Sequence, residues 1–108
     1  MGLHLKPLTE AEFTRQVIAF ARLHGWRVAH FRSARTARGW RTPVQGDGKG
    51  FPDLILVGHS RIIVAELKVG RKTLTADQTE WIAAFVLAGA GAYVWYPSDW
   101  PEIESVLQ

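Results

Sequence analysis

Two short apolar runs separated by four residues constrain the fold of this chain more than any other feature. Residues 54–57 read LILV, residues 62–67 read IIVAEL, and the intervening GHSR predicts a hairpin turn. Both runs are apolar on both faces, which is typical of strands in the centre of a sheet. The sequence therefore predicts two neighbouring central strands.

Charged residues stand at the margins of these two strands. Asp53 precedes the first run, and Glu66 and Lys68 lie at the end of the second. Side-chain alternation puts Glu66 and Lys68 on the same face, about 6–7 Å apart. Asp53 reaches the same place if the runs pair as a hairpin. Buried charges are costly unless something pairs them, so these residues indicate a site. The ordinary alternative is a turn-ending aspartate beside a solvated ion pair.

Two capping boxes predict where helices begin. Thr9 with Glu12, and Thr75 with Gln78, have the spacing in which side-chain and backbone groups exchange hydrogen bonds at a helix start. Apolar residues then recur at helical spacing, and glycines follow the last turns. The predicted helices cover residues 10–24 and Thr75 to about Leu87.

The remaining predicted elements are two strands and a short final helix. WRVAHF (26–31) and AYVWY (92–96) read as strands, and a short helix follows Ser98 or Asp99. The order α-β-β-β-α-β-α predicts an α/β fold with a central mixed four-stranded sheet flanked by helices. Residues 32–50, with four glycines and a proline, read as a long loop.

Composition narrows the class of protein. A chain of 108 residues, 47% hydrophobic and 21% charged, predicts one globular domain over residues 1–108. The absence of cysteine excludes disulfides, thiol catalysis and zinc fingers. No apolar run approaches the roughly 20 residues of a membrane span, and the N-terminus lacks a signal-peptide pattern. We therefore expect a soluble, cytoplasmic protein with no membrane partner.

The net charge of +3 is unevenly distributed. Between Arg22 and Lys49 the chain carries seven basic residues and one acidic residue. Basic side chains are natural contacts for phosphate groups, although each one also reads as ordinary solvated surface. The candidate DNA-binding residues are Arg32, Arg35, Arg38, Arg41, Lys49, Arg71 and Lys72. Trp40 can stack on an unpaired base or pack within the loop.

Two carboxylates and a lysine at one edge of a sheet suit the metal-assisted hydrolysis of a phosphodiester. Hard oxygen ligands leave coordination positions open for water and a phosphate oxygen, as Mg²⁺ prefers. A neighbouring lysine can orient the water or stabilise the developing negative charge. The lack of cysteine and of clustered histidines favours Mg²⁺ or Mn²⁺ over Zn²⁺. His4, His24, His30 and His59 read as core or surface residues.

The segments GKGFPDLILV (48–57) and IIVAELK (62–68) resemble the signature of the PD-(D/E)xK nuclease superfamily. Over residues 9–96 the chain is more narrowly similar to the VRR-NUC family. The residues that carry this likeness are Glu12, Gln16, Gly25-Trp26, Gly48 to Leu54, Glu66, Lys68, Leu74-Thr75 and Gln78. The family implies a restriction-endonuclease-like core of helix, three-stranded meander, helix and strand, which agrees with the order predicted above.

The resemblance implies a role for each matching residue at the sheet edge. Asp53 and Glu66 would bind the metal ion, with the backbone carbonyl of Leu67 as a further ligand. Lys68 would assist the attacking water. All four would therefore belong to one catalytic centre.

The resemblance assigns two further residues to this centre. Glu12 would complete the acidic cluster through an intervening water, and Gln78 would support the site or the phosphate. Each of them also has a full structural explanation as a capping residue. Glu10 is the alternative acidic residue on the first helix.

The resemblance implies an endodeoxyribonuclease that depends on Mg²⁺ or Mn²⁺. Small single-domain members resemble Holliday junction resolvases, whose symmetric cleavage requires a two-fold pair of sites. We therefore expect a homodimer that acts on branched DNA. The alternatives are a flap-type or restriction-type nuclease and a DNA-binding module without catalysis. An origin in a phage or mobile element would not be surprising, although no residue indicates it.

Overall fold

The order of elements agrees with the sequence prediction, with the addition of two short strands and a 3₁₀ turn. The computed structural model describes residues 6–31, 34–36, 39–41 and 44–108, of which 34–36 and 39–41 are described by their backbone alone. The elements are α1 (Glu10–Leu23), β1 (Arg27–His30), β2 (Ala34–Thr36), β3 (Gly39–Arg41), β4 (Leu54–Gly58), β5 (Arg61–Leu67), α2 (Ala76–Leu87), β6 (Gly91–Trp95), the 3₁₀ turn η1 (Pro97–Asp99) and α3 (Trp100–Leu107). Apart from β2 and β3, this is the predicted α-β-β-β-α-β-α order.

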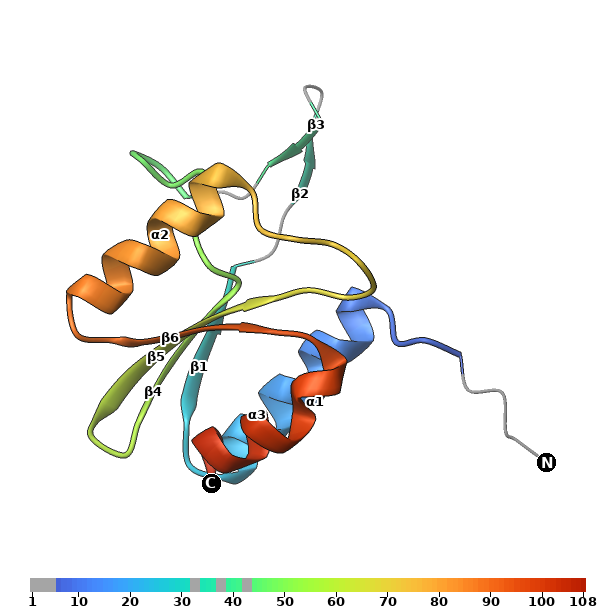
Figure 1. Cartoon of the computed structure of the whole chain (residues 1–108), viewed down its shortest axis with the longest axis vertical. Helices are drawn as coiled ribbons and strands as arrows, with labels where there is room; N and C mark the ends of the chain where they lie inside the picture. The colour runs from blue at the N-terminus through green and yellow to red at the C-terminus, as the bar shows by residue number, and fades with distance from the viewer. Residues whose placement is uncertain (1–5, 32–33, 37–38, 42–43) are drawn as a thin grey trace.

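A mixed four-stranded sheet in the order β1-β4-β5-β6 forms the centre of the molecule. β1, β4 and β5 are antiparallel neighbours, whereas β6 runs parallel to β5. A parallel neighbour requires a crossover connection, and α2 supplies it. α2 lies on one side of the sheet, and α1 and α3 lie on the other (Figure 1). The prediction that β4 and β5 are the central strands is confirmed.

A two-residue turn joins β4 to β5 and fixes their register. His59 and Ser60 have φ angles of 50° and 58°, the left-handed conformation that both central residues of a type I′ hairpin turn require. The turn pairs Gly58 with Arg61, and the ladder continues to Leu54 with Ala65. The register therefore follows directly from the length of the turn.

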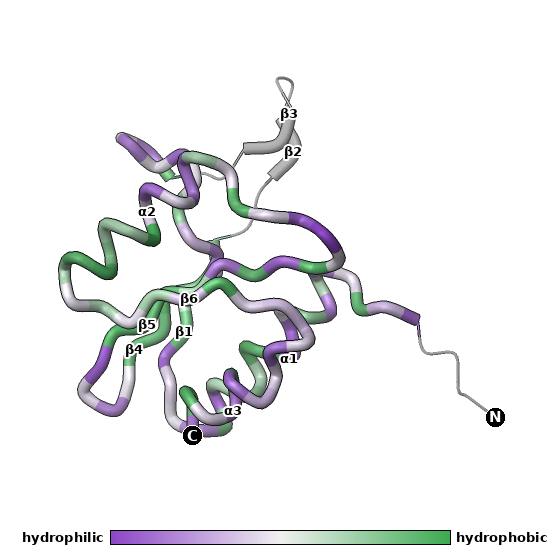
Figure 2. The backbone as a smooth tube through the Cα atoms, in the orientation of Figure 1, coloured by the Kyte–Doolittle hydropathy of each residue, from purple (hydrophilic) through white to green (hydrophobic). Residues whose placement is uncertain are grey.

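The main core lies between the sheet and the pair α1 and α3. Phe13, Val17 and Ala21 recur every four residues on α1 and are fully buried. They share one cluster with alternate residues of the central strands and with α3, namely Leu54, Leu56, Ile63, Ala65, Leu67, Trp95, Ile103 and Leu107. Figure 2 shows these strands as a largely apolar centre. On the other side, α2 has no fully buried residue, so this face is packed less completely.

The prediction of an uninterrupted loop over residues 32–50 is wrong. β2 and β3 form a separate two-stranded antiparallel sheet in which Ala34 pairs with Arg41 and Thr36 with Gly39. Strands of three residues are too short to give an alternating pattern that can be recognised in a sequence. Within the described ranges no helix is long and apolar enough to cross a membrane.

Candidate functional site

The hairpin register brings the two predicted carboxylates together. Leu54 pairs with Ala65, so Asp53, one residue earlier, lies opposite Glu66 on the next strand. The backbone extends the sheet by one residue, because the carbonyl of Asp53 accepts a hydrogen bond of 2.8 Å from Phe31 N–H. One carboxylate oxygen of Asp53 accepts a hydrogen bond of 2.8 Å from Leu67 N–H. Asp53 is thus held against the end of β5.

A buried network joins Glu66 to Lys68. Both side chains are nearly inaccessible, with exposed fractions of 3% for Glu66 and 9% for Lys68. Lys68 Nζ lies 3.4 Å from Glu66 Oε2 and donates a hydrogen bond of 2.9 Å to Gln78 Oε1. Gln78 Nε2 donates to the same Glu66 oxygen at 3.0 Å. The three side chains therefore form a closed triangle on the α2 side of the sheet.

Gln78 is at once a capping residue and a member of this network. Its Oε1 accepts from Thr75 N–H at 2.9 Å, and Thr75 Oγ1 accepts from Gln78 N–H at 3.2 Å, which completes the capping box. The orientation of the amide is settled by its neighbours, since Oε1 faces two donors and Nε2 faces a carboxylate. The start of α2 is therefore fixed by the same side chain that holds Lys68 and Glu66.

Burial raises the pKa values of both carboxyls. Burial, followed by the negative charge of Asp53, raises the pKa of Glu66 to about 8, against the opposing effect of Lys68. Burial is also the main cause that raises the pKa of Asp53, opposed by the Leu67 N–H and reinforced by the charge of Glu10. Two carboxylates facing each other at low accessibility cannot both ionise cheaply. Without a cation, the pair retains a proton at neutral pH.

The first helix presents Glu10, rather than Glu12, to this pair. Glu12 is exposed, and its carboxylate accepts a hydrogen bond of 2.9 Å from Thr9 N–H, which lowers its pKa. Asp53 responds to the charge of Glu10, whose carboxylate also lies 3.7 Å from Lys72 Nζ. The structure thus brings together Asp53, Glu66, Lys68 and Gln78, and it leaves Glu12 at the cap.

The loop before Asp53 is held against α2 by Trp81, Gly50 and Phe51. Trp81 is half-buried and donates from its indole N–H to the carbonyls of Asp47 and Lys49, at 3.0 and 3.1 Å. Gly50 has a φ of +81°, and a Cβ there would lie 2.6 Å from Asp77 backbone. Phe51 packs its ring edge-on against Trp81 at 4.9 Å. In the sequence, the position of Trp81 one turn after the capping box of α2 was the signal that could have indicated this contact with the loop.

The predicted DNA-binding residues fall into two groups. Arg32 and Arg38, and the side chains of Arg35, Trp40 and Arg41, lie outside the described part of the chain. Lys49, Arg71 and Lys72 are exposed near the N-terminal end of α2. Of these, Lys49 lies 3.5 Å from Asp77. The described basic residues thus lie beside the triangle of Glu66, Lys68 and Gln78, although their contacts with DNA remain a prediction.

The residues present fit a hard divalent cation held by few protein ligands. Glu66 Oε1 is buried and has no hydrogen-bond partner. A buried oxygen of this kind is costly unless a proton or a cation satisfies it. Among the described residues no group of three or more histidines and carboxylates is close enough to form a full cage. Mg²⁺ and Mn²⁺ accept one or two carboxylates and complete their coordination with water and phosphate oxygens.

Comparison with solved structures identifies a protein of the same fold. The chain is similar to Hjc, a Holliday junction resolvase from the archaeal hyperthermophile Archaeoglobus fulgidus, with a TM-score of 0.54 and 22% sequence identity. The match covers 81% of this chain and 69% of that one. Comparison of the sequence with family profiles and with curated proteins gives no match. The chain therefore has the α/β fold of this resolvase, and the predicted restriction-endonuclease-like architecture is confirmed.

Proposed function

We propose that this protein is a metal-dependent endodeoxyribonuclease of the PD-(D/E)xK superfamily and a member of the VRR-NUC family. The observation that supports it most strongly is the pairing of Asp53 with Glu66 beside a buried Lys68. A fold could keep these charges out of its interior at little cost, yet here they interrupt two otherwise apolar central strands. Perturbed carboxyls that converge with a lysine are typical of catalytic sites.

Asp53, Glu66 and the Leu67 carbonyl would hold the cation in this proposal. A divalent cation bound there would polarise a phosphate oxygen and acidify a water molecule. The buried Glu66 Oε1 supports this assignment, since no donor group of the protein is placed to hydrogen-bond to it. Glu66 must release its proton when the cation binds, because its pKa of about 8 leaves it protonated at neutral pH.

Lys68 would act on the reacting groups through its remaining donor. An ammonium group has three N–H donors, and Glu66 and Gln78 take two of them. The third can orient the attacking water or stabilise the negative charge that develops on the phosphate. Hydrolysis adds the water oxygen to phosphorus, breaks one phosphorus–oxygen ester bond and transfers a proton to the leaving oxygen. Gln78 keeps Lys68 in place throughout.

Glu10 takes the position on α1 that the resemblance assigned to Glu12. Glu10 is close enough to Asp53 to affect its ionisation, whereas Glu12 is engaged in the cap of its own helix. A carboxylate at this distance can bind a water molecule of the cation's coordination shell. We therefore assign Glu10 to the outer part of the site.

Branched DNA, and in particular a four-way junction, is the proposed substrate. The likeness to a Holliday junction resolvase supports this choice. A junction is cut symmetrically when two active sites are related by a two-fold axis. The proposal therefore includes a homodimer.

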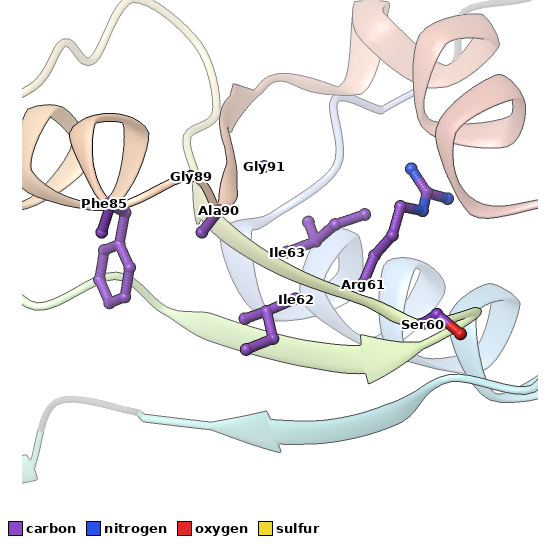
Figure 3. Close-up of a pocket in the computed structure, with 9 residues that line it drawn as sticks. Ser60, Arg61, Ile62, Ile63, Phe85, Gly89, Ala90 and Gly91 are labelled. Carbon is purple, nitrogen blue, oxygen red and sulfur yellow. The ribbon is translucent and has the colours of Figure 1, made fainter.

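An apolar face on the α2 side of the sheet suits the interface of this homodimer. Val57 and Ile62, which pair directly across β4 and β5, are 48% and 54% exposed, and Val86 on α2 is 56% exposed. A hollow of about 470 Å³ lies between the C-terminal end of α2 and β5, and Ile62 and Phe85 are among the residues that line it (Figure 3). Contiguous exposed apolar surface of this kind is typical of protein interfaces. A second copy of the chain would cover it.

Cleavage of defined DNA substrates tests the proposal. Wild-type protein and Lys68→Ala are incubated with a four-way junction, a flap and a linear duplex, each with Mg²⁺ or Mn²⁺. We expect symmetric nicks across the junction by the wild type and none by Lys68→Ala. Preferential cutting of the flap or duplex would favour the other nuclease classes. If neither protein cuts any substrate while both bind DNA, the chain is a DNA-binding module.

A further inference from the structure

Lys72 lies at the surface beside Glu10, the acidic residue of α1 that is assigned to the outer part of the site. It belongs to the loop between β5 and α2, and its side chain is about two-thirds exposed, with Nζ 3.7 Å from Glu10 Oε2. Its partner Glu10 is about half-exposed, and the negative charge of Glu10 helps to raise the pKa of Asp53. A cation bound at Asp53 and Glu66 would therefore compete with Lys72 for the carboxylate of Glu10.

The backbone of Lys72 is anchored although its side chain is exposed. The Tyr96 hydroxyl donates a short hydrogen bond to the Lys72 carbonyl, and Lys72 N–H donates to the Val69 carbonyl at 3.4 Å. The loop turns at Gly70, whose φ is +61°. A long flexible side chain on a fixed backbone can move its charge by several ångströms without moving the loop. Lys72 can thus leave Glu10 at little structural cost.

We propose that Lys72 is a positioning residue that pairs with Glu10 in the cation-free protein and passes to a DNA phosphate when a divalent cation is bound. This inference rests on the proposed function and adds a means of regulation to the same site. Cation binding draws Glu10 towards the cation, and the released ammonium becomes available to the substrate backbone. Because such coupling is reciprocal, bound DNA also strengthens cation binding. Lys72 thereby favours assembly of the complete enzyme–cation–DNA complex.

Cation binding without DNA provides the first test. Mn²⁺ is titrated by calorimetry into wild type, Lys72→Ala and Arg71→Ala at one pH and ionic strength. Arg71 carries the same charge on the neighbouring residue, and no ion pair of it is found among the described residues, so Arg71→Ala measures the general effect of losing a positive charge. We expect Lys72→Ala to bind Mn²⁺ about two- to fivefold more tightly, as expected for the loss of a partly exposed ion pair, and Arg71→Ala to change by less.

DNA binding with and without a cation provides the second test. The affinity for a labelled four-way junction is measured in EDTA and in Ca²⁺, with intact DNA verified on a denaturing gel. We expect Ca²⁺ to tighten binding by the wild type, and this factor to fall about two- to fivefold in Lys72→Ala. Lys72→Arg, which keeps the charge, should restore it. Arg71→Ala should weaken binding equally under both conditions.

The outcomes separate this inference from the proposed function. Equal changes of Mn²⁺ affinity in Lys72→Ala and Arg71→Ala would overturn the inference. So would a loss of DNA affinity in Lys72→Ala that is the same in EDTA and Ca²⁺. In both cases cleavage by the wild type would leave the proposed function intact. A wild type that neither binds Mn²⁺ nor cuts DNA would overturn both.

Discussion

Gln78 shows how one side chain can couple the start of a helix to a network of buried charged groups. Its amide oxygen serves both Thr75 N–H and Lys68 Nζ, and its amide nitrogen serves Glu66. Glu12 occupies the equivalent position in the capping box of α1 without any contact to the carboxylate pair. The two residues therefore form a natural matched pair for mutation.

Replacement of either capping residue by alanine separates the two roles of Gln78. Gln78→Ala and Glu12→Ala each remove one side chain from a capping box, so both should lower the free energy of unfolding. Gln78→Ala should lower it more, because it also removes a hydrogen-bond partner from the buried Lys68 and Glu66. Only Gln78→Ala should reduce the cleavage rate, by about 10- to 100-fold, because Lys68 and Glu66 lose their shared partner. Urea denaturation and single-turnover cleavage measure the two effects. Equal cleavage rates in both variants would leave Gln78 with a capping role alone.

The raised pKa of Glu66 predicts how stability depends on pH. Between the ordinary value of 4.5 and about 8, the folded protein holds a proton that the unfolded chain releases. Stability of the cation-free protein should therefore fall as the pH rises through this window, on the order of 2–4 kcal/mol in total. Melting curves in EDTA from pH 5 to pH 8 measure this slope.

Two further measurements identify Glu66 as the group responsible. Glu66→Gln cannot ionise, so its melting temperature should lack this part of the slope. The stabilisation of the wild type by Mn²⁺ should increase with pH, since binding displaces the proton. An unchanged slope in Glu66→Gln would assign the titration to another group.

At the scale of elements, the loop before β4 and the start of α2 pack together as one unit. Trp81 donates hydrogen bonds to two carbonyls of the loop. Because Gly50 has no side chain, the backbone of the loop can lie against Asp77 and Gln78. The unit therefore connects the loop that leads into Asp53 with the helix that presents Gln78. A change in the spacing of these two elements must displace Asp53 relative to Gln78.

Two glycines in this loop differ only in their surroundings. Gly46 and Gly50 both have positive φ, 70° and 81°, but a Cβ at Gly46 would meet nothing within 4 Å. Gly46→Ala should therefore cost about 1–2 kcal/mol for conformation alone, whereas Gly50→Ala should cost more and should also lower cleavage. Urea denaturation of both variants tests this. Equal destabilisation would show that the loop can move away from α2.

The sequence was most informative where local chemistry decides local structure. Both capping boxes and the hairpin turn were predicted, because each depends on a few neighbouring residues. β2 and β3 were missed because their pairing is set by two three-residue segments without an apolar pattern. The choice between Glu10 and Glu12 could not be made either, since it depends on how α1 is rotated against the sheet.

At the scale of the whole molecule, the two faces of the sheet are unequal. One face is closed by α1 and α3 over a fully buried core, and the other leaves Val57, Ile62 and Leu87 exposed beside α2. Figure 2 shows apolar residues at the C-terminal end of α2 and along β4 and β5. Such a difference is consistent with the proposed homodimer, in which a second copy would cover the exposed apolar residues.

A charge placed among the exposed apolar residues on the α2 side of the sheet should weaken the proposed homodimer. Ile62→Glu should weaken the dimer by more than about tenfold, which corresponds to the transfer free energy of one buried isoleucine. Leu23→Glu, at an exposed leucine on α1 with 80% accessibility, is the control and should leave the dimer unchanged. Sedimentation velocity measures the assembly state. Equal behaviour of both variants would locate the interface elsewhere.

The turn between β4 and β5 has a consequence for how this protein can change over time. Its two residues lie at the opposite end of the strands from Asp53, yet they determine that Asp53 lies opposite Glu66. Surface turns usually tolerate insertions and deletions, but one residue gained or lost here would shift the ladder and send a carboxylate to the wrong face. Descendants of this sequence can exchange the two turn residues for others that adopt a positive φ, whereas the length of the turn must stay the same.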